Sequence, residues 1–220
     1  MIEAKNIYLT YDDNKYIIKK GNFSIKPQEF IFIGGNSGSG KSTLLKSFYG
    51  DIPLKHGSLK IENQEVFGIK GKKLRLLRKD IGIIFQDYKL INEFTIEENI
   101  MIPLKINGYS HEISKDQANK LLAHVRLSHR AGYYPNELSG GEQQRVAVAR
   151  ALAHNPKIII ADEPTGNLDD YSAEVVWNLL KGANEQLGIT VVVVTHRVPK
   201  NLGIKFRQLS IEDGIIYEVS

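Results

Sequence analysis

The chain contains four short runs of apolar residues that no polar residue interrupts. Valine, isoleucine and phenylalanine dominate these runs, which span residues 30–33, 81–85, 158–161 and 191–194, with Gly82 inside the second. Continuous β-branched and aromatic runs are typical of strands buried on both faces of a parallel sheet. The pattern therefore predicts an α/β fold with a mainly parallel core sheet.

Polar or glycine-rich residues follow each of these four runs. The pairs are Gly34-Gly35, Gln86-Asp87, Asp162-Glu163 and Thr195-His196. In open α/β sheets, ligands bind beyond the carboxyl ends of the strands. Because all four pairs would lie at strand ends of the same polarity, we expect them to contribute to one site.

Apolar residues at helical spacing predict two helices in the second half of the chain. The first spans residues 141–153 and stops before Pro156, which cannot continue a helix. The second spans residues 172–187, with Ser172 as the expected N-terminal cap and Gly188 as the C-terminal cap.

The two ends of the chain carry a different pattern from its middle. Residues 2–9 and 16–25 resemble antiparallel strands, and residues 207–211 and 215–219 resemble a hairpin. Residues 94–135, in contrast, are mainly helical in pattern and hold no long apolar run. This region therefore indicates an inserted helical subdomain.

The length of 220 residues suits one domain with an insertion better than two full domains. We expect a core of about residues 1–93 and 154–220, which includes the antiparallel strands. We expect the helical subdomain at about residues 94–153.

Composition and charge narrow the class of protein. Charged residues at 25% and hydrophobic residues at 42% are ordinary for a globular domain. The absence of cysteine excludes disulfides, thiolate catalysis and cysteine-based zinc sites. We find no pattern of a secretory signal, and no apolar run approaches the roughly 20 residues that a spanning helix needs. A net charge of +4 is too small to indicate nucleic acid by itself.

The strongest chemical signal is Gly35-Asn36-Ser37-Gly38-Ser39-Gly40-Lys41-Ser42, which follows a predicted strand and opens a helix. Its spacing matches a phosphate-binding loop, in which glycines let several backbone N–H groups face one anion at a helix N-terminus. Lys41 would supply a positive charge for the β- and γ-phosphates, and Ser42 a hydroxyl for Mg²⁺. A flexible glycine-serine turn is the alternative. A dinucleotide-binding fingerprint does not fit, because Thr43 occupies its third glycine position.

Asp162 and Glu163 follow the third apolar run and are expected to form the second half of a nucleotide hydrolase. Asp162 would hold Mg²⁺ through water, and Glu163 would orient and deprotonate the attacking water. Neighbouring carboxylates repel each other, so a cation favours the form in which both are ionised. The alternative is a solvated Asp-Glu turn before Pro164.

The sequence Leu138-Ser139-Gly140-Gly141-Glu142-Gln143-Gln144-Arg145 begins a second predicted helix. One interpretation is a capped helix start, with Ser139 as the N-cap and Glu142 completing a capping box. That interpretation leaves the paired glycine unexplained. Exposed amides at Gly140 and Gly141 would be able to bind an anion as well.

These motifs, in this order and spacing, make nearly the whole chain resemble the ATP-binding cassette (ABC) ATPases, which are P-loop NTPases. The family's phosphate loop corresponds to residues 35–42, its signature sequence to 138–144 and its second acidic motif to 158–163. Tyr11 corresponds to the family's adenine-stacking aromatic residue, and Gln86 to its γ-phosphate-sensing glutamine. Asn167-Leu168-Asp169 corresponds to the dimer-communication loop, and His196 to the switch histidine.

The resemblance implies an Mg²⁺-dependent ATP hydrolase with the fold of an ABC nucleotide-binding domain. Its ligand set would include the phosphate loop with Thr43, and the catalytic set would be Glu163, His196 and Gln86. Magnesium would be held by Ser42, Gln86 and Asp162. Two chains would form a head-to-tail homodimer on ATP, to which each contributes Ser139, Gly140, Gly141 and Asp169.

Two of these residues also have simpler interpretations. Tyr11 is one of ten tyrosines, and its ring could simply cover the edge of a strand. His196 would also suit a capping position at the end of a strand. Their places before the phosphate loop and after the fourth apolar run favour the functional roles.

Within the family, several strings are most similar to the ATPases of bacterial cell division, and lipoprotein-releasing and macrolide-exporting ATPases share them. They are residues 77–78, 81–87, 98–104, 138–146 and 161–170. This similarity implies an integral membrane partner of the cell-division type, which would hold the chain at the cytoplasmic face of the membrane. A cassette ATPase that acts on nucleic acid and an ATP-gated scaffold with negligible turnover are the other classes. We expect no nucleic-acid partner, since the chain has neither tandem cassettes nor a long coiled-coil insertion.

Six lysines and arginines lie between residues 70 and 79. We interpret them as the solvated face of a helix that Leu74 and Leu77 anchor. Contact of this face with anionic lipid headgroups is the alternative.

Overall fold

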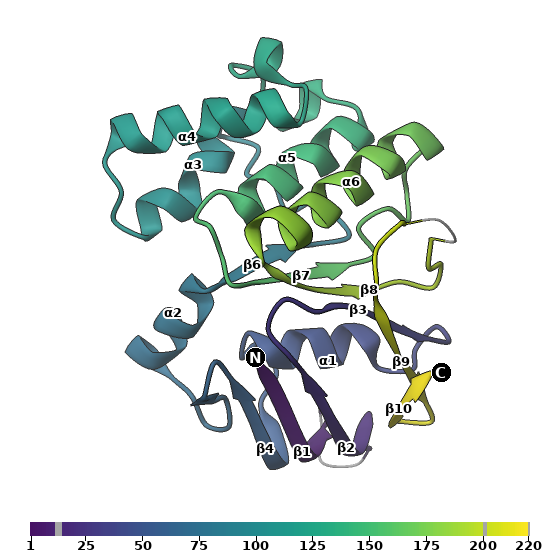
Figure 1. Cartoon of the computed structure of the whole chain (residues 1–220). Coiled ribbons are helices and arrows are strands. Elements are labelled where there is room, and N and C mark those ends of the chain that lie inside the picture. Colours follow the sequence, from purple (N-terminus) through teal and green to yellow (C-terminus); the bar gives the residue numbers. More distant parts are fainter. Residues whose placement is uncertain (12–14, 200–201, 220) are drawn as a thin grey trace.

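The chain forms a helical layer, a core sheet and an antiparallel sheet, which follow one another from top to bottom in Figure 1. The computed structural model describes residues 1–11, 15–199 and 202–219. One helix, α1 (Lys41–Phe48), lies between the two sheets. The helical layer covers the opposite face of the core sheet, so the central strands of that sheet are buried on both sides.

The core sheet has six strands in the order β10-β9-β3-β8-β7-β6. Their bounds are β3 (Phe30–Gly35), β6 (Ile81–Ile84), β7 (Ile158–Asp162), β8 (Thr190–Val194), β9 (Arg207–Glu212) and β10 (Ile215–Val219). All neighbours pair in parallel except β10, which runs antiparallel to β9. The four apolar runs therefore form parallel strands, as predicted, and the predicted hairpin at the end of the chain is confirmed.

Gly82 interrupts the second apolar run because α5 (Gly140–Leu152) approaches β6 closely there. A Cβ atom on Gly82 would lie only 2.3 Å from the carbonyl oxygen of Ala151. The glycine thus allows a helix of the upper layer to rest directly on the sheet.

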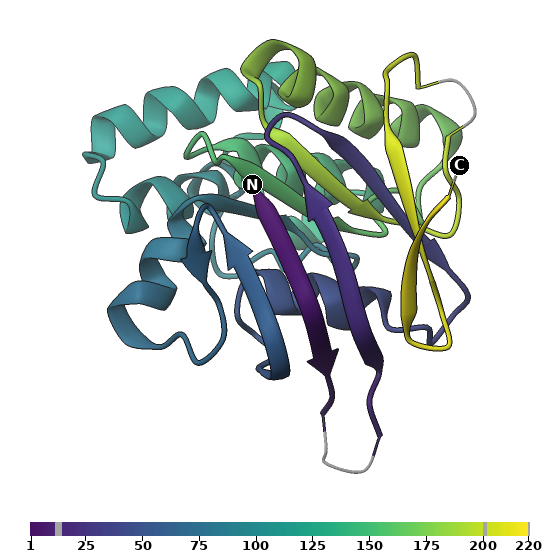
Figure 2. The same cartoon turned by 60° about the horizontal axis from the view of Figure 1, so that its bottom comes forward.

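The antiparallel sheet has the strand order β2-β1-β4-β5 and is turned toward the viewer in Figure 2. Its strands are β1 (Ile2–Leu9), β2 (Ile18–Ile25), β4 (Leu54–Ile61) and β5 (Gln64–Glu65). The antiparallel pairing of the first two is confirmed, although the second begins two residues later than predicted. The sequence pattern did not predict β4, whose buried Leu59 and Ile61 alternate with the exposed Lys60.

The helical layer comes mainly from the middle of the sequence. Its helices are α3 (Ile96–Ile106), α4 (His111–His124), α5 and α6 (Asp170–Leu187), with short 3₁₀ turns at Ser128–Arg130 and Pro135–Glu137. In Figure 1, α5 and α6 lie against the sheet and α4 lies farther out. The basic run forms α2 (Gly71–Lys79), in which Leu77 is buried and Leu74 packs against the core.

One predicted helix cap is wrong. The second long helix begins at Asp170, so Ser172 lies inside its first turn and does not cap it. The carboxylate of Asp169 accepts a hydrogen bond from the backbone N–H of Ser172 at 2.9 Å, which makes Asp169 the N-cap. Both residue types suit a cap, and the helix starts at the earlier one because its side chain reaches the first-turn amide. Gly188 ends the helix with a φ of 66°, as predicted.

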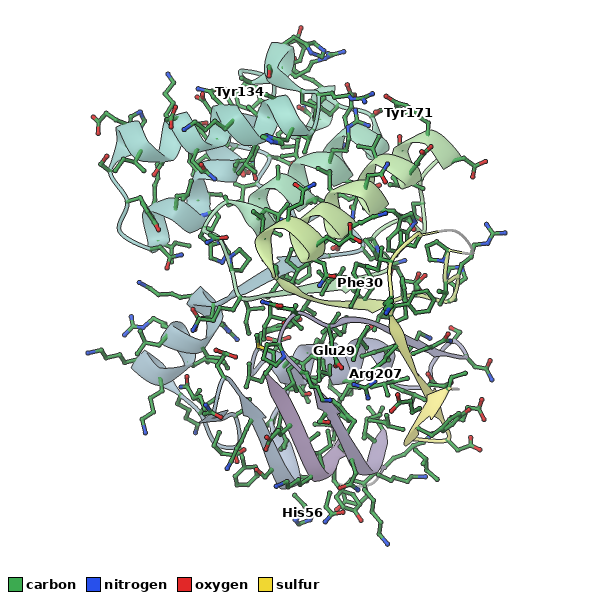
Figure 3. All side chains as sticks on the ribbon, in the orientation of Figure 1. Glu29, Phe30, His56, Tyr134, Tyr171 and Arg207 are labelled. Carbon is green, nitrogen blue, oxygen red and sulfur yellow. The ribbon has the colours of Figure 1, made fainter. Side chains whose placement is uncertain are left out.

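Arg207 connects the two sheets and pairs with Glu29. Arg207 of β9 holds Glu29 with Nη1 at 2.8 Å from Oε2, and the same nitrogen donates to the carbonyl of Ser24 in β2. Glu29 and Arg207 lie near each other in the lower half of Figure 3. Glu218 also accepts from this guanidinium, which raises the pKa of Arg207 above its ordinary value. The bond to Ser24 joins β9 of the core sheet to β2 of the antiparallel sheet.

Candidate functional site

A cavity of about 1190 Å³ opens at the carboxyl end of the core sheet. The residues that follow β6, β7 and β8 line it together with the loop between β3 and α1. Among the expected site residues, those in its wall are Tyr11, Asn36, Ser37, Gly38, Ser39, Gly40, Lys41, Ser42, Thr43, Gln86, Asp162, Glu163 and His196. The segments that follow the four strands thus contribute to one cavity, as the sequence pattern predicts, although after β3 the contribution begins at Asn36 and not at Gly34-Gly35.

The loop from Gly35 to Gly40 has a backbone that only glycine adopts readily. Gly35, Gly38 and Gly40 have φ angles of 134°, 77° and 105°, in the region that disfavours side chains. A Cβ atom on Gly35 would lie 2.4 Å from the carbonyl oxygen of Ile211, whereas nothing lies within 4 Å of one on Gly38. The first glycine therefore allows close packing, and the second leaves open space beside the cavity.

No side chain caps the N-terminus of α1. Its N-cap position is Gly40, which has no side chain to accept a hydrogen bond. The amides of the first turn of a helix have no partner inside the helix, and the helix dipole places partial positive charge there. This end of α1, which faces the cavity, is therefore suited to an anion.

Lys41 folds back over the loop. Its Nζ atom donates to the carbonyl oxygens of Gly35 and Asn36, both at 2.8 Å. Two backbone carbonyls thereby hold the ammonium group beside the loop amides. A bound phosphate would meet a positive charge that is already positioned.

Ser42 and Asp162 meet across the cavity from different elements. The hydroxyl of Ser42 in α1 donates to Oδ1 of Asp162 at the end of β7, at 3.2 Å. Burial raises the pKa of Asp162, and the nearby charge of Glu163 adds to this increase, while the hydrogen bond from Ser42 opposes it. A cation between these groups would offset the effects of burial and of Glu163 on this pKa, because it favours the ionised carboxylate.

Glu163 is held by two hydrogen bonds from one residue. Its Oε1 atom accepts from the backbone N–H of His196 at 3.0 Å and lies 3.0 Å from the ring Nδ1. Its other carboxylate oxygen, Oε2, is buried without a hydrogen-bond partner. Glu163 also has a φ of 45°, an unfavourable backbone conformation for a residue with a side chain. One oxygen is therefore fixed, and the other remains able to accept a proton.

Tyr11 lies beside the phosphate loop. Its hydroxyl oxygen is 3.5 Å from the side-chain oxygen of Thr43, and 64% of the residue is exposed. An exposed ring at the edge of the cavity is available to stack on a planar group.

The residues of the signature sequence lie elsewhere, as does Asp169 of the dimer-communication loop. Ser139, Gly140, Gly141 and Asp169 are not in the wall of this cavity. They gather instead where α5 and α6 begin: a Cβ atom on Gly141 would lie 2.4 Å from Oγ of Ser172 and 3.8 Å from the carboxylate of Asp169. A single chain does not bring these residues to Lys41.

Ser139 has the capped conformation that the sequence predicts. Its hydroxyl accepts from the N–H of Glu142 at 3.3 Å, and the Glu142 carboxylate accepts from the Ser139 N–H at 2.9 Å. This capping box is complete. The N–H of Ser139 lowers the pKa of Glu142, with burial opposing this effect.

The oxygen donors of the cavity fit Mg²⁺ in type. Mg²⁺ favours hard oxygen ligands and usually keeps several waters, so that one or two protein oxygens suffice beside a phosphate. Ser42 and Asp162 supply a hydroxyl and a carboxylate in hydrogen-bond contact, and Gln86 lies in the same wall. Within the described residues, no three histidines, aspartates and glutamates form a cluster that would hold a metal without such a phosphate.

Part of the cavity wall comes from residues that the sequence analysis did not single out. Lys15, Tyr16, Ile17, Lys19 and Gly166 contribute to it, and residues 211–214 contribute from the C-terminal hairpin. The N–H of Lys19 donates to the carbonyl of Gly214 at 2.8 Å, which joins the hairpin to the start of β2. No local motif predicts such a contact, because it joins residues from opposite ends of the chain.

Comparison with known proteins identifies the class of this fold and site. The profile of the ABC transporter family matches residues 18–166. The structure superposes on a dimeric, post-hydrolysis state of the ATP-binding cassette MJ0796 bound to ADP and Pi, with a TM-score of 0.91 and 39% identity, covering 100% of this chain and 98% of that one. The chain therefore belongs to the ABC transporter family.

Two relatives have different functions in their names. The cell division ATP-binding protein FtsE of Streptococcus pneumoniae is 40% identical over 214 residues, which cover 97% of this chain and 93% of the relative. The bacitracin export ATP-binding protein BceA of Halalkalibacterium halodurans is 40% identical over 221 residues, which cover 99% and 87%. Identity alone therefore does not separate these roles.

The family membership and the cavity together define an ATP-binding and ATP-hydrolysing ABC ATPase. No helix in the described parts of the chain is both long and apolar enough to cross a bilayer.

Proposed function

We propose that this protein is the ATPase subunit of a membrane complex of bacterial cell division, in which two copies close on ATP and drive a conformational change in an integral membrane partner. In this role the protein resembles FtsE, and its partner would be of the FtsX type. ATP hydrolysis at the cytoplasmic face of the membrane would then control cell-wall hydrolases at the septum.

The hydrolytic part of the proposal rests on how the carboxylate of Glu163 is held. His196 fixes one oxygen, while the buried second oxygen has no hydrogen-bond partner and belongs to a residue of the cavity wall. A general base needs an oriented carboxylate with one oxygen free to take a proton from water. Glu163 would therefore deprotonate the attacking water, and His196 would hold Glu163 in position and contact the γ-phosphate.

The remaining wall would bind the nucleotide. Tyr11 would stack on adenine, and the loop of residues 35–42, with Thr43, would enclose the phosphates. Lys41 would neutralise the β- and γ-phosphates. Ser42, Asp162 and Gln86 would hold Mg²⁺, which supplies charge neutralisation on the phosphate oxygens when bound.

A second chain would complete each site. Ser139, Gly140 and Gly141 lie outside the chain's own cavity. The similarity to cassettes whose titles describe dimers supports a head-to-tail homodimer, in which these residues and Asp169 of one copy face the ATP of the other. Binding of ATP would close the dimer, and hydrolysis would open it.

Glu163→Gln tests the hydrolytic assignment. The amide keeps the size of the side chain but cannot accept a proton from water, so we expect ATP turnover to fall by about 10²- to 10⁴-fold. Binding of ATP should persist, so that a stable ATP-bound dimer accumulates in size-exclusion chromatography. Lys157→Gln on the opposite end of β7 serves as the matched control, because Lys157 contacts Asp80 and Glu62 and is not in the cavity wall. Unchanged turnover in Glu163→Gln would exclude this residue as the base.

The cell-division role rests on the relatives and on the local strings, of which residues 81–87 and 161–170 are the longest contiguous ones near the site. Affinity purification from membranes of the source cell, with crosslinking in the presence of ATP, tests it. We expect an FtsX-like membrane protein to copurify with the Glu163→Gln variant. Recovery of a lipoprotein-release permease in its place would overturn the cell-division assignment.

Peptide export is the second candidate function, because the bacitracin export relative is equally identical over nearly the whole chain. An export permease recovered in the same purification would favour it. Deletion of the gene separates the two roles further, since loss of export would sensitise cells to a peptide antibiotic and loss of the septal role would give chains of undivided cells.

A further inference from the structure

Arg150, near the end of α5, holds the loop that follows β6. Its Nη2 atom donates to the carbonyl oxygen of Tyr88 and its Nη1 atom to that of Lys89, both at 2.6 Å. The side chain is partly buried, and burial lowers the pKa of Arg150 to about 10, so the guanidinium stays charged at neutral pH. Hydrogen bonds from a charged donor are stronger than those between neutral groups.

The loop that Arg150 holds has an unfavourable backbone conformation. Tyr88 and Lys89 have φ angles of 61° and 48°, two consecutive left-handed residues that are not glycine. The N–H of Lys89 donates to the carbonyl of Asp87 at 2.6 Å, and its ammonium group pairs with the Asp87 carboxylate at 2.7 Å. Residues persist in such a conformation when surrounding contacts fix them. Arg150 supplies two of these contacts.

The same loop also contacts the other end of α5. The hydroxyl of Tyr88 lies 3.0 Å from the position that a Cβ atom on Gly140 would take. Tyr88 therefore lies against the first residue of α5 through its side chain, while its carbonyl is bound by a residue of the last turn. The loop and the helix are connected at two points along the helix.

This connection joins the two half-sites of one chain. Gln86 precedes Tyr88 by two residues and lies in the wall of the ATP cavity. Ser139 and Gly141 lie at the start of α5, outside that cavity. A displacement of the loop at Gln86 would pull on α5 through Arg150 and Tyr88.

We propose that Arg150 is a positioning residue that fastens the loop of residues 87–89 to α5, so that occupancy of the chain's own ATP site moves Ser139 and Gly141, which complete the site of the partner copy. This inference rests on the proposed function, because it requires a dimer with two composite ATP sites. It assigns Arg150 to communication between the sites, and not to contact with the nucleotide.

The test compares Arg150→Met with Arg207→Met in the purified full chain. Both substitutions remove a hydrogen-bonded guanidinium. The hydrogen bonds of Arg207, however, go to Ser24, Glu29 and Glu218, and not to the loop or to α5. The measurements are ATP turnover as a function of ATP concentration, and binding of a fluorescent ATP analogue to the chain under dilute, monomeric conditions.

For Arg150→Met we expect turnover to fall by about 10- to 100-fold, because a small misplacement of the signature residues disrupts the composite site. The affinity of the dilute chain for the fluorescent analogue should stay within about twofold, since no residue of the cavity wall has changed. The Hill coefficient should approach about 1, because the sites no longer communicate. Arg207→Met should keep the wild-type Hill coefficient.

Arg150→Lys provides a second variant that is more readily folded. Lysine keeps the charge but not the planar fork that reaches two carbonyls, so turnover and the Hill coefficient should lie between those of the wild type and of Arg150→Met. Equal Hill coefficients in the wild type and both Arg150 variants would overturn the inference. A parallel loss of analogue binding and turnover would also overturn it, because it would indicate general damage to the ATP site. A wild-type chain without ATP turnover would instead refute the proposed function.

Discussion

The two glycine-containing loops of this protein both open a helix, yet their glycines serve different purposes. In the loop before α1, Gly38 and Gly40 have positive φ angles, and the helix start has no side-chain cap. In the loop before α5, Gly140 and Gly141 have ordinary helical conformations, and a complete capping box satisfies the helix start. The first loop therefore leaves its amides available to an anion within the same chain.

The comparison also explains the glycines of the second loop. A Cβ atom on Gly141 would collide with Ser172 of α6, and one on Gly140 would meet only the end of the Tyr88 side chain. The capping interpretation leaves the paired glycine unexplained, and its second member, Gly141, thus has a packing reason in the single chain. Binding of the partner's nucleotide would be a second use of the same small surface.

Among the variants that test this comparison, Lys41→Met should have the largest effect, because it removes the positive charge from the uncapped loop. We expect ATP turnover to fall by at least about 100-fold, since charge on the transferred phosphate is no longer neutralised. Lys46→Met is the matched control, because Lys46 lies in the same helix but not in the cavity wall. A steady-state phosphate-release assay measures both, and equal rates in the two variants would contradict the role of the first loop.

A smaller effect separates the two glycines of the second loop. Gly141→Ala should lower the free energy of unfolding by about 1–3 kcal/mol, because its Cβ atom would overpack the contact with Ser172. Gly140→Ala should have little cost, since the end of the Tyr88 side chain can move and alanine favours a helix over glycine. Urea denaturation of both variants measures the difference. Equal stability of the two would show that Gly141 has no packing role.

The smallest effect concerns the capping box. The pKa of Glu142 is lowered in the fold, chiefly by the N–H of Ser139, so its contribution to stability is present above the unfolded pKa of about 4.3 and is lost as the pH falls through the folded pKa. Glu142→Gln should therefore destabilise the protein by about 0.5 kcal/mol at pH 7. Urea unfolding at pH 7 and pH 3 measures this, and the difference between the two proteins should shrink as the pH falls. A difference that stays constant between these pH values would contradict the assignment.

The sequence predicted the elements whose signals are local. Unbroken apolar runs predicted the four central parallel strands, and the spacing of glycines with Lys41 and Ser42 predicted the loop that lines the cavity. These features depend on a few neighbouring residues, so the pattern suffices. The cap of α6 was assigned wrongly because two suitable side chains, Asp169 and Ser172, stand three positions apart and local chemistry does not choose between them.

Other parts of the site depend on contacts between distant residues. The sequence pattern does not predict that the C-terminal hairpin lines the cavity, or that Arg150 binds the carbonyls of Tyr88 and Lys89. Backbone carbonyls are the same at every position, so a contact with one leaves no mark in the residue types. Strand β4 was missed for a related reason, because only one face of that strand is apolar and its run is short.

The sequence by itself determined the kind of chemistry that this protein carries, because the phosphate loop and the Asp162-Glu163 pair are contiguous motifs with a fixed spacing. The tertiary structure decided where the second half of that chemistry lies. It joins Glu163 to His196, which follow different strands, and it keeps Ser139 and Gly141 away from Lys41. The reason is physical: a strand end and a helix start are set by neighbouring residues, whereas the distance between them is set by how sheet and helices pack.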